Sequence, residues 1–465
     1  MKQKARQLFL KQKRFDLIFK YLYLKYPEND FVKGAYLENI RAFNGFYEVE
    51  PSDGVAKNSA EDFLRSFDVL YNSIQTGGFD KKMGIIPLGD NGEISDGAHR
   101  LAVCAYLDLD VETKGDGRND LYDYKFFEHQ KMDPDIMDYG ALEYVKLNHN
   151  AYIVNLHSVT DTAKDDQVVQ ILEKYGFVYY KKEINLTFDG YVNLKKLSYG
   201  SFWDREDWIG NVENKFAGAQ MHAKNSMGKN PLRAFVFVCN DLQKVIQAKA
   251  EIRELFNLGN FSIHINDSRE EAIWLAETYF NKNSLEMINR RPLDYEDPQF
   301  DKMVEELKKT AQQHKVDLGD ICGAGSTPFD IYGLRGSSDL DFLYCGNKDF
   351  DIQTETLSNH DSELDYYPFP KKIIIQNPEH HFYYHGLKFI TLDVLYEMKK
   401  KRHEIPKDVN DCKMIECFRK NKKYKIKTFK LFEKRKSGNK RKIILFGFIK
   451  INYRKRGKKC PKASN

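Results

Sequence analysis

Two aspartates, Asp339 and Asp341, stand one residue apart behind a Gly-Ser turn. In an extended strand alternate side chains point to the same face, so the two carboxylates converge while their neighbours enter the core. Paired carboxylates bind hard cations such as Mg²⁺, and the backbone amides around Gly325 and Ser326 can hold a triphosphate. This combination predicts phosphoryl or nucleotidyl transfer, in which metal ions bridge phosphate oxygens and position the attacking hydroxyl.

A longer pattern surrounds the aspartates, running from Gly325-Ser326 through Tyr-Gly-Leu-Arg to Ser-Ser-Asp-Leu-Asp. It resembles the nucleotidyltransferase signature of the polymerase-beta superfamily, over about residues 300 to 415. The alternative is a surface turn that enters an edge strand. The resemblance implies these roles: Gly325, Ser326, Arg335 and Ser338 as nucleotide contacts, and Asp339 and Asp341 as catalytic residues and metal ligands, with Mg²⁺ and an NTP (ATP or CTP) as cofactors.

The family also uses a third carboxylate on a later strand. The segment 380–391 is predicted as a strand at a suitable distance, but it carries no acid, which leaves open an inactive or altered site. Residues 392–411 resemble the helix and Lys/Arg cluster that follow the core of these enzymes. The candidates for the third carboxylate are Asp361, Glu363, Asp365, Glu379 and Asp393.

Two elements must position the Gly-Ser loop. Residues 301–314 have helical periodicity, and the apolar residues between 316 and 322 predict a short strand before Gly325. This helix, strand and loop come in the order that the resemblance requires.

A second motif, Asp-Gly-Ala-His-Arg, runs from Asp96 to Arg100 between a predicted strand and a predicted helix. A glycine at such a turn lets the backbone approach a phosphate, and Arg100 adds a charged clamp beside the helix N-terminus. The motif resembles the ParB/sulfiredoxin superfamily, whose members use CTP or ATP. This implies phosphate binding by Gly97 and Arg100 and catalysis by His99 or Asp96. The alternative is that Asp96 caps the helix and His99 packs in its first turn.

The first domain contains further predicted elements: helices over 5–24, 60–73 and 101–107, a strand over 85–88, and an exit segment over 115–139. The next segment predicts a ferredoxin-like βαββαβ layer of helices on a sheet. Its predicted strands cover 152–156, 176–183, 232–239 and 261–265, and its predicted helices cover 167–175, 241–255 and 269–280.

Parts of this layer resemble nucleoside diphosphate kinase, and His264 then takes the position of that family's phosphorylated histidine. Against this, Asn155-Leu156-His157 replaces the family's Lys-Pro-Asp, and the glycines after the histidine are missing. The alternative is a histidine packed at a sheet end, followed by a helix cap at Asp267 or Ser268. His264 is therefore a candidate phosphohistidine in a degenerate domain.

Charge is distributed unevenly along the 465 residues. Residues 419–465 hold 20 Lys/Arg and one acid, whereas the remaining 418 residues hold 53 Lys/Arg and 67 Asp/Glu. Within this tail the apolar run 443–449 lies between basic clusters, which suits an anionic membrane surface, a nucleic-acid backbone as the less favoured partner, or a solvated disordered tail. The run is too short to span a bilayer.

Composition indicates a globular protein: 42% of residues are hydrophobic, enough to fill several cores. Seven scattered cysteines form neither a zinc nor a disulfide pattern, and the charged N-terminus is unlike a secretory signal. A cytoplasmic protein, peripheral at the inner membrane face through its tail, is expected.

These patterns predict an α+β multidomain chain. The predicted parts are a ParB/sulfiredoxin-like domain at 1–145, a ferredoxin-like domain at 146–290, a nucleotidyltransferase domain at 291–418 with a linker over 281–300, and a basic tail at 419–465. The expected function is transfer of NMP to a small acceptor, a sugar or polyol phosphate in surface-polysaccharide biosynthesis, coupled to an N-terminal kinase or phosphate-binding domain. The alternatives are a kinase with an inactive C-terminal domain, and a nucleotide-sensing regulator that binds nucleic acid.

Overall fold

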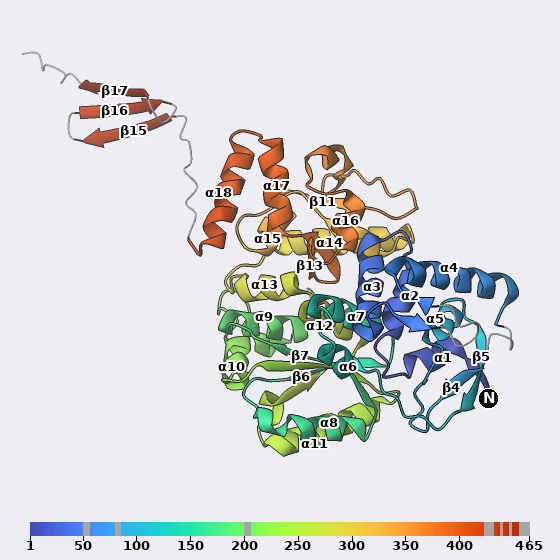
Figure 1. Ribbon diagram of the computed structural model, residues 1–465. Coiled ribbons are helices and arrows are strands. Elements are labelled where there is room, and N and C mark those ends of the chain that lie inside the picture. The colour runs from blue at the N-terminus through green and yellow to red at the C-terminus, as the bar shows by residue number, and fades with distance from the viewer. Residues whose placement is uncertain are drawn as a thin grey trace, which may run out of the picture. The chain divides into compact units, whose positions relative to one another are not determined.

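The computed structural model describes residues 1–49, 56–79, 85–199, 206–422, 432–437, 440–445 and 449–454. The chain forms two compact units, Met1–Lys401 and Arg402–Asn465. Helices and strands are mixed along the chain, and the strands form several small sheets (Figure 1). The mixed α and β composition is thus confirmed, whereas the boundaries at 145 and 290 lie inside the first unit and stay predictions.

The N-terminal part is mainly helical around a small sheet of order β1-β5-β4. Strand β1 pairs antiparallel with β5, and β4 pairs parallel with β5. Its strands are β1 Lys2–Lys4, β2 Glu48–Val49, β3 Ala56–Lys57, β4 Ile86–Leu88 and β5 Asp110–Gly115. Its helices are α1 Ala5–Leu10, α2 Leu17–Lys25, α3 Asp30–Asn44, α4 Ala60–Gly77, α5 Ala98–Tyr106, α6 Tyr124–His129 and α7 Pro134–Leu147.

The predicted helix over 5–24 is wrong, because the chain breaks between α1 and α2. In the break the guanidinium of buried Arg14 donates to Asp16 at 2.8 Å and to the carbonyl of Ile94 at 3.0 Å. These contacts tie the break to a segment 80 residues later, which a helical pattern does not reveal. The segment 115–139, predicted as the exit from the first domain, contains α6 and the start of α7, which Asp133 caps before Pro134.

The middle part is a four-stranded antiparallel sheet of order β7-β8-β6-β9. Helices α8 and α11 cover one face, and α12 covers the other (Figure 1). The predicted elements of this part are present: β6 Ala151–Leu156, α8 Asp165–Glu173, β7 Phe177–Ile184, β8 Leu232–Val238, α11 Leu242–Phe256, β9 Ile263–Ile265 and α12 Arg269–Tyr279. Unpredicted elements are α9 Phe188–Ser198, α10 Ala217–Ser226, and the short 3₁₀ helices η2 Thr162–Lys164, η3 Asp207–Ile209 and η4 Gly259–Phe261.

The segment 281–300, predicted as a linker, contains α13 Lys282–Arg290, capped by Asn281, and the start of α14 at Pro298. Beyond it lies a mixed sheet of order β12-β11-β10-β14-β13. Its elements within the first unit are α14 Pro298–Gln313, η5 Leu318–Asp320, β10 Ile321–Gly323, α15 Thr327–Ile331, β11 Leu340–Tyr344, β12 Leu357–Asn359, η6 Asp361–Tyr366, α16 Lys371–Gln376, β13 His381–Tyr384 and β14 Leu387–Ile390. The helix α17 Leu392–Arg402 follows.

The single strand predicted over 380–391 is wrong, because it is the hairpin of β13 and β14. The chain reverses at His385 and Gly386, both with positive φ. At the outer edge of β13, the backbone N–H of Tyr383 donates to Ser284 Oγ at 2.9 Å, and the carbonyl of His381 accepts from Asn283 at 3.0 Å. Side chains from the start of α13 therefore satisfy the backbone groups of this edge strand.

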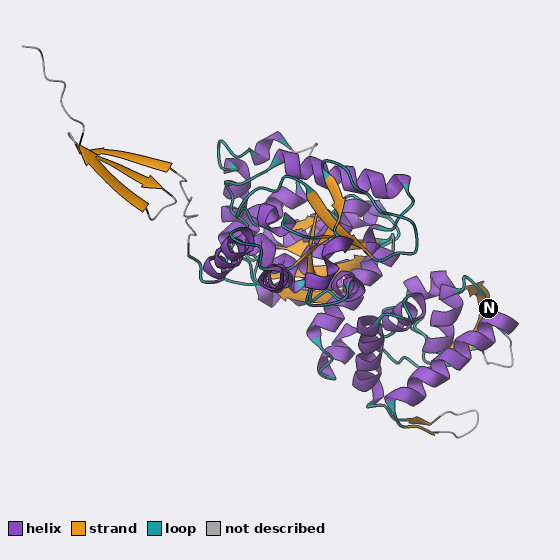
Figure 2. Ribbon diagram, turned by 90° about the horizontal axis from the view of Figure 1, so that it is seen from above, coloured by secondary structure: helices purple, strands orange, loops and turns teal. Residues whose placement is uncertain are grey.

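One continuous core of buried side chains runs from Ala5 to Phe280 and includes Tyr383. Strands lie inside and helices outside in the larger part of Figure 2. The second unit contains α18 Lys407–Arg419 and an antiparallel sheet of β15 Phe432–Ser437, β16 Lys440–Leu445 and β17 Ile449–Arg454. The rest of the predicted basic tail lies outside the described residues. Within the described part of the chain, no helix is long and apolar enough to cross a membrane.

Candidate functional site

The Gly-Ser loop and the paired aspartates lie on two neighbouring strands. Strand β10 pairs antiparallel with β11, and the backbone N–H of Ala324 then donates to the carbonyl of Asp341 at 2.7 Å. Asp339 immediately precedes β11, and Leu340 between the two aspartates is fully buried, as the alternating pattern predicts. The loop therefore begins directly beside the Asp-Leu-Asp segment.

Gly325 brings the loop against a carboxylate. Its φ is +55°, a left-handed conformation, and a Cβ added there would lie 1.9 Å from Asp341 Oδ2. Its buried N–H donates to the hydroxyl of Tyr367 at 3.1 Å, and that hydroxyl lies 2.8 Å from His360 Nδ1. The other ring nitrogen of His360 lies 3.8 Å from Asp341 Oδ2. Tyr367 and His360, which sequence reasoning missed, thus hold the loop and the carboxylate together.

Arg335 and the serines border the same loop. Arg335 donates to Ser326 Oγ at 3.0 Å, and its guanidinium lies over the ring of Phe329 at 4.8 Å. Ser338 donates to Asp339 Oδ1 at 2.8 Å. The structure therefore brings the residues predicted as nucleotide contacts to one place beside the aspartates.

A buried aspartate supports the turn that leads to Asp339. Asp330 is 1% exposed and accepts from the hydroxyl of Tyr295 at 2.9 Å and from the backbone N–H of Ser337 at 2.7 Å. Burial raises its pKa to about 6. Sequence reasoning missed this residue, because its partners lie 35 and 7 residues away.

In the part of the chain that the structure describes, no third carboxylate joins the two aspartates. Among the described residues, no group of three or more His, Cys, Asp or Glu side chains can hold a metal ion. Opposite Asp341 on the neighbouring strand stands Ser358, and the candidate Asp361 pairs with Lys371 at 2.5 Å. Two carboxylates without a third are still a donor set that Mg²⁺ uses, because this ion commonly binds one or two carboxylates together with substrate phosphates rather than an all-protein cage.

Tyr367→Phe tests the support of the loop. Without the hydroxyl, the buried N–H of Gly325 loses its acceptor. Leaving a buried N–H without an acceptor destabilises the folded state by about 1–3 kcal/mol. We expect this loss in the free energy of unfolding, measured by urea denaturation. The neighbouring Tyr366→Phe, at a half-buried side chain, is the control and should change stability by less than about 0.5 kcal/mol. Equal effects of the two changes would contradict the role of Tyr367.

The N-terminal motif is only partly brought together. Gly97 has a φ of +79° and is itself the N-cap of α5, so the capping role considered for Asp96 is wrong. Asp96 lies 3.6 Å from Arg100, and the Arg100 guanidinium covers the position of a Gly97 Cβ. His99 instead packs against α3 and α4, with Nε2 3.0 Å from the hydroxyl of Tyr36. Burial lowers the pKa of His99 well below its ordinary value. These contacts are those of a packed histidine.

His264 is 4% exposed and bonded through both ring nitrogens. Nδ1 lies 3.0 Å from the hydroxyl of Tyr199, and Nε2 lies 2.6 Å from Glu271 Oε1. Burial lowers its pKa, which the Glu271 carboxylate opposes. The next helix is capped by Ser268, one of the two predicted caps. A phosphoryl group at Nδ1 would have to displace the hydroxyl of Tyr199.

A buried pair near His264 has no sequence signal. Lys195 on α9 and His157 after β6 are both fully buried, with Nζ 2.7 Å from Nε2. His157 Nδ1 lies 2.9 Å from the carbonyl of Phe261. No motif links two residues that lie 38 positions apart.

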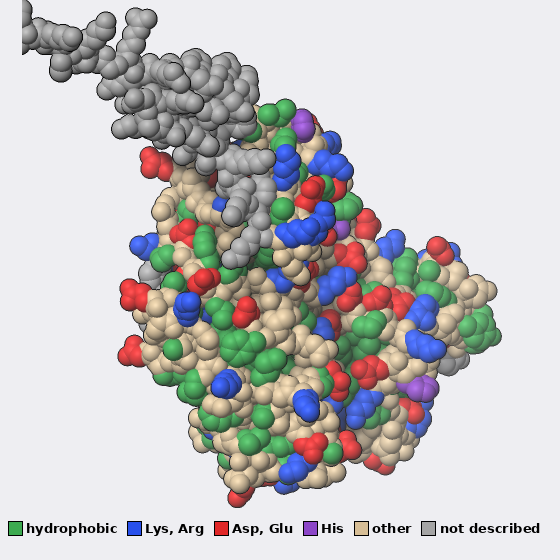
Figure 3. Space-filling model, turned by 90° about the vertical axis from the view of Figure 1, so that its left-hand side faces the viewer, with side chains coloured by type: hydrophobic (Ala, Val, Ile, Leu, Met, Phe, Trp, Pro, Cys, Tyr) green, Lys and Arg blue, Asp and Glu red, His purple; other side chains and the backbone are tan. Residues whose placement is uncertain are grey.

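Basic and acidic side chains are interspersed over most of the face shown in Figure 3. The described part of that face therefore offers no extended basic surface of the kind that binds nucleic-acid backbones. Comparison of the chain with protein-family models, with curated proteins and with solved structures found no match.

Proposed function

We propose that this chain is a magnesium-dependent nucleotidyltransferase that transfers NMP from ATP or CTP to a small acceptor, a sugar or polyol phosphate. The observation that carries the proposal is the contact between the Gly325 loop and the carboxylate of Asp341. Nucleotidyl transfer requires phosphate-binding amides and metal-binding carboxylates side by side, because catalysis is mainly positioning and charge stabilisation.

Each residue has a role in this proposal. Asp339 and Asp341 hold Mg²⁺, which when bound neutralises charge on the phosphates. The Gly325-Ser326 turn orients the triphosphate, while the N–H of Gly325 itself is held by the hydroxyl of Tyr367. Arg335, held by Ser326 and by the ring of Phe329, supplies a fixed positive charge to it.

The test is incubation of the purified chain with Mg²⁺, each of the four NTPs labelled at the α- or γ-phosphate, and a pool of sugar and polyol phosphates. We expect transfer of the α-label with release of pyrophosphate. Asp339→Asn and Asp341→Asn should each reduce the rate by about 10³-fold or more, because removing one preorganised charged group typically costs 10²–10³-fold and these groups also hold the metal.

Asp351→Asn is the matched control, because Asp351 is an exposed acid of the same segment. It should leave α-label transfer unchanged. An absence of α-label transfer with every NTP and acceptor would refute the proposal, and so would full activity of Asp341→Asn.

A phosphate-binding turn before α5 is a second candidate. It is favoured by the left-handed Gly97, over which the guanidinium of Arg100 is folded. Transfer of the γ-label that survives Asp339→Asn but is lost in Arg100→Ala would move the chemistry to this turn and make the chain a kinase.

A further inference from the structure

The antiparallel sheet of the second unit has two faces of different composition. Strand β16 pairs with β15 on one side and with β17 on the other, and among the described residues the three strands pair only with one another. Alternate residues of a strand share a face, and so do directly opposite residues of neighbouring strands. The register of the three strands therefore assigns each of their residues to one of the two faces.

One face, here called the Ile443 face, is mainly apolar. It consists of three rows of directly opposed residues, and each row has one residue from each strand. Six of its nine positions hold aliphatic or aromatic residues, and the other three hold Lys or Arg. The rows are Phe432, Leu445 and Ile449; Lys434, Ile443 and Ile451; and Lys436, Arg441 and Tyr453.

The other face, here called the Ile444 face, is polar and basic. Five of its nine positions hold Lys or Arg, and one is apolar. The consecutive isoleucines Ile443 and Ile444 therefore lie on opposite faces of one strand. The rows are Glu433, Ile444 and Lys450; Arg435, Lys442 and Asn452; and Ser437, Lys440 and Arg454.

A sheet with one apolar face is stabilised when that face is removed from water. A second copy of the sheet is an unfavourable cover, because the three strands hold eight Lys/Arg and one acid. Two packed sheets lie only about 10 Å apart, so charges of one sign would meet. A nucleic acid suits the basic residues, but binding to its phosphates does not remove aliphatic residues from water.

An anionic membrane surface matches both properties of the sheet. Its acyl chains accept aliphatic and aromatic residues, and its negative surface potential attracts Lys and Arg close to it. Residues 419–465 hold 20 Lys/Arg and one acid, so the whole segment carries the charge opposite to that of the lipid. This charge complementarity selects an anionic over a neutral membrane, and the apolar rows select a membrane over other polyanions.

We propose that the Ile443 face binds the surface of a membrane that contains anionic phospholipids. The wholly apolar row of Phe432, Leu445 and Ile449 enters the boundary between headgroups and acyl chains. The row that ends in Tyr453 lies at the level of the headgroups, where tyrosine, lysine and arginine are favoured. The Ile444 face remains in water.

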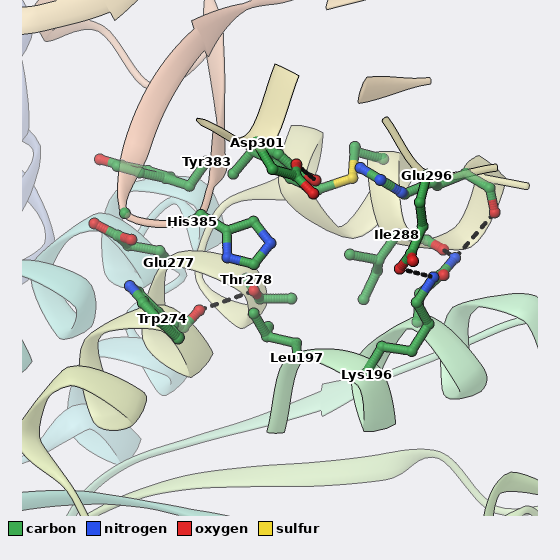
Figure 4. A pocket seen from close by; sticks show the side chains of 15 residues that line it. Lys196, Leu197, Trp274, Glu277, Thr278, Ile288, Glu296, Asp301, Tyr383 and His385 are labelled. Carbon is green, nitrogen blue, oxygen red and sulfur yellow. Dashed lines mark hydrogen bonds and ion pairs between the residues drawn. The ribbon is translucent and has the colours of Figure 1, made fainter. Parts of the chain in front are cut away.

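This surface is separate from the first unit, and the proposal does not depend on nucleotidyl transfer. The first unit contains a cavity between α9, α12, α13, α14 and the β13–β14 hairpin (Figure 4). It measures about 70 Å³, which admits water and other small molecules. A sheet face of nine residues requires an extended surface instead.

The first test is sedimentation of the full chain with vesicles of phosphatidylcholine alone, and with vesicles of phosphatidylglycerol and phosphatidylcholine mixed one to three. We expect binding to the anionic vesicles and little binding to the neutral ones. Raising NaCl from 0.1 to 0.5 M should weaken the binding about tenfold or more, because salt screens the attraction between the basic residues and the lipid.

The second test uses the two consecutive isoleucines as a matched pair in the full chain. Ile443→Asn should weaken binding to the anionic vesicles about tenfold or more, because an aliphatic residue that leaves water on binding is replaced by a polar one. Ile444→Asn is the same change one position away, on the face that remains in water. It should alter the binding less than about twofold.

The third test reads the contact directly and does not depend on how asparagine affects the sheet. Ile443→Trp and Ile444→Trp each add an indole, and brominated phosphatidylcholine in the anionic vesicles quenches an indole that it touches. We expect strong quenching of the added fluorescence in Ile443→Trp and little in Ile444→Trp. The unchanged chain supplies the baseline for its three own tryptophans.

Four outcomes would overturn the proposal. Two are a lack of binding to both kinds of vesicle and equal quenching in the two Trp variants. The third is binding of duplex DNA in place of anionic vesicles, which would make nucleic acid the partner. The fourth is a dimer that binds no vesicles and becomes a monomer in Ile443→Asn, which would make a second copy the partner. None of these readouts is α-label transfer, so failure of the nucleotidyltransferase assay stays distinguishable.

Discussion

Gly325→Ala is expected to reduce α-label transfer by about 100-fold or more and to destabilise the fold. The added Cβ would lie 1.9 Å from Asp341 Oδ2, and the left-handed φ of +55° adds a cost of about 1–2 kcal/mol for any residue with a Cβ. Displacing the carboxylate adds about 1–3 kcal/mol of overpacking. A displacement of about 1 Å in a site that acts by positioning can cost 100-fold in rate.

Gly336→Ala is the matched control, because a Cβ there would lie 3.5 Å from Asp297 Oδ2, an ordinary contact, in the same loop region. It should change the free energy of unfolding by less than about 1 kcal/mol and keep most of the activity. Urea denaturation and the α-label assay measure both quantities. If Gly325→Ala retained full transfer, the contact between loop and carboxylate would have no part in catalysis.

Lys195→Met is expected to stabilise the protein at pH 6 by about 2 kcal/mol or more. Burial lowers the pKa of Lys195 from 10.5 to about 7, a difference worth at most about 5 kcal/mol. Methionine has a similar shape and no charge to desolvate, but it leaves His157 Nε2 without its 2.7 Å partner, which costs about 1–3 kcal/mol. The neighbouring Lys196→Met should instead destabilise, because Glu296 loses its partner.

The same burial fixes the sign of a pH effect. The unfolded chain keeps a proton on Lys195 up to about pH 10.5, whereas the folded chain releases it above about pH 7. Raising the pH between these values therefore favours the folded state, and below pH 7 the penalty is present in full. Lys195→Met should remove this pH-dependent increase in the free energy of unfolding. The check is urea denaturation of the unchanged chain and of Lys195→Met at pH 6, 8 and 9.5. Parallel profiles would show that Lys195 stays charged in the fold.

The sequence predicted a helix or strand correctly where the apolar residues repeat with a single helix or strand period over the whole element. Strand β6 and helix α11 appear within two residues of their predicted limits, because their apolar residues repeat with the strand and helix periods. Other elements depend on contacts across long separations. The break between α1 and α2 is held by Arg14 and Ile94, and the hairpin turn at Gly386 interrupts an apolar run that reads as one strand.

In the candidate site, too, local sequence patterns predicted some features, whereas contacts between distant residues determine others. The sequence placed Gly325 and Asp341 near each other, since a loop and a strand of known order imply it. It did not reveal that Ser358 stands opposite Asp341, because strand register depends on pairing that no local pattern encodes. Tyr367, His360 and Asp330 were missed for a similar reason: each matters through partners brought close only by the fold.

The covered edge of β13 has a consequence for the behaviour of the protein at high concentration. An uncovered edge strand presents free N–H and C=O groups to which a strand of another molecule can pair, and this is a common route to aggregation. Here Ser284 and Asn283 occupy those groups at Tyr383 and His381. The start of α13 thus protects the β13 edge of the sheet against strand-by-strand self-association, a role that depends on two small polar side chains rather than on charge.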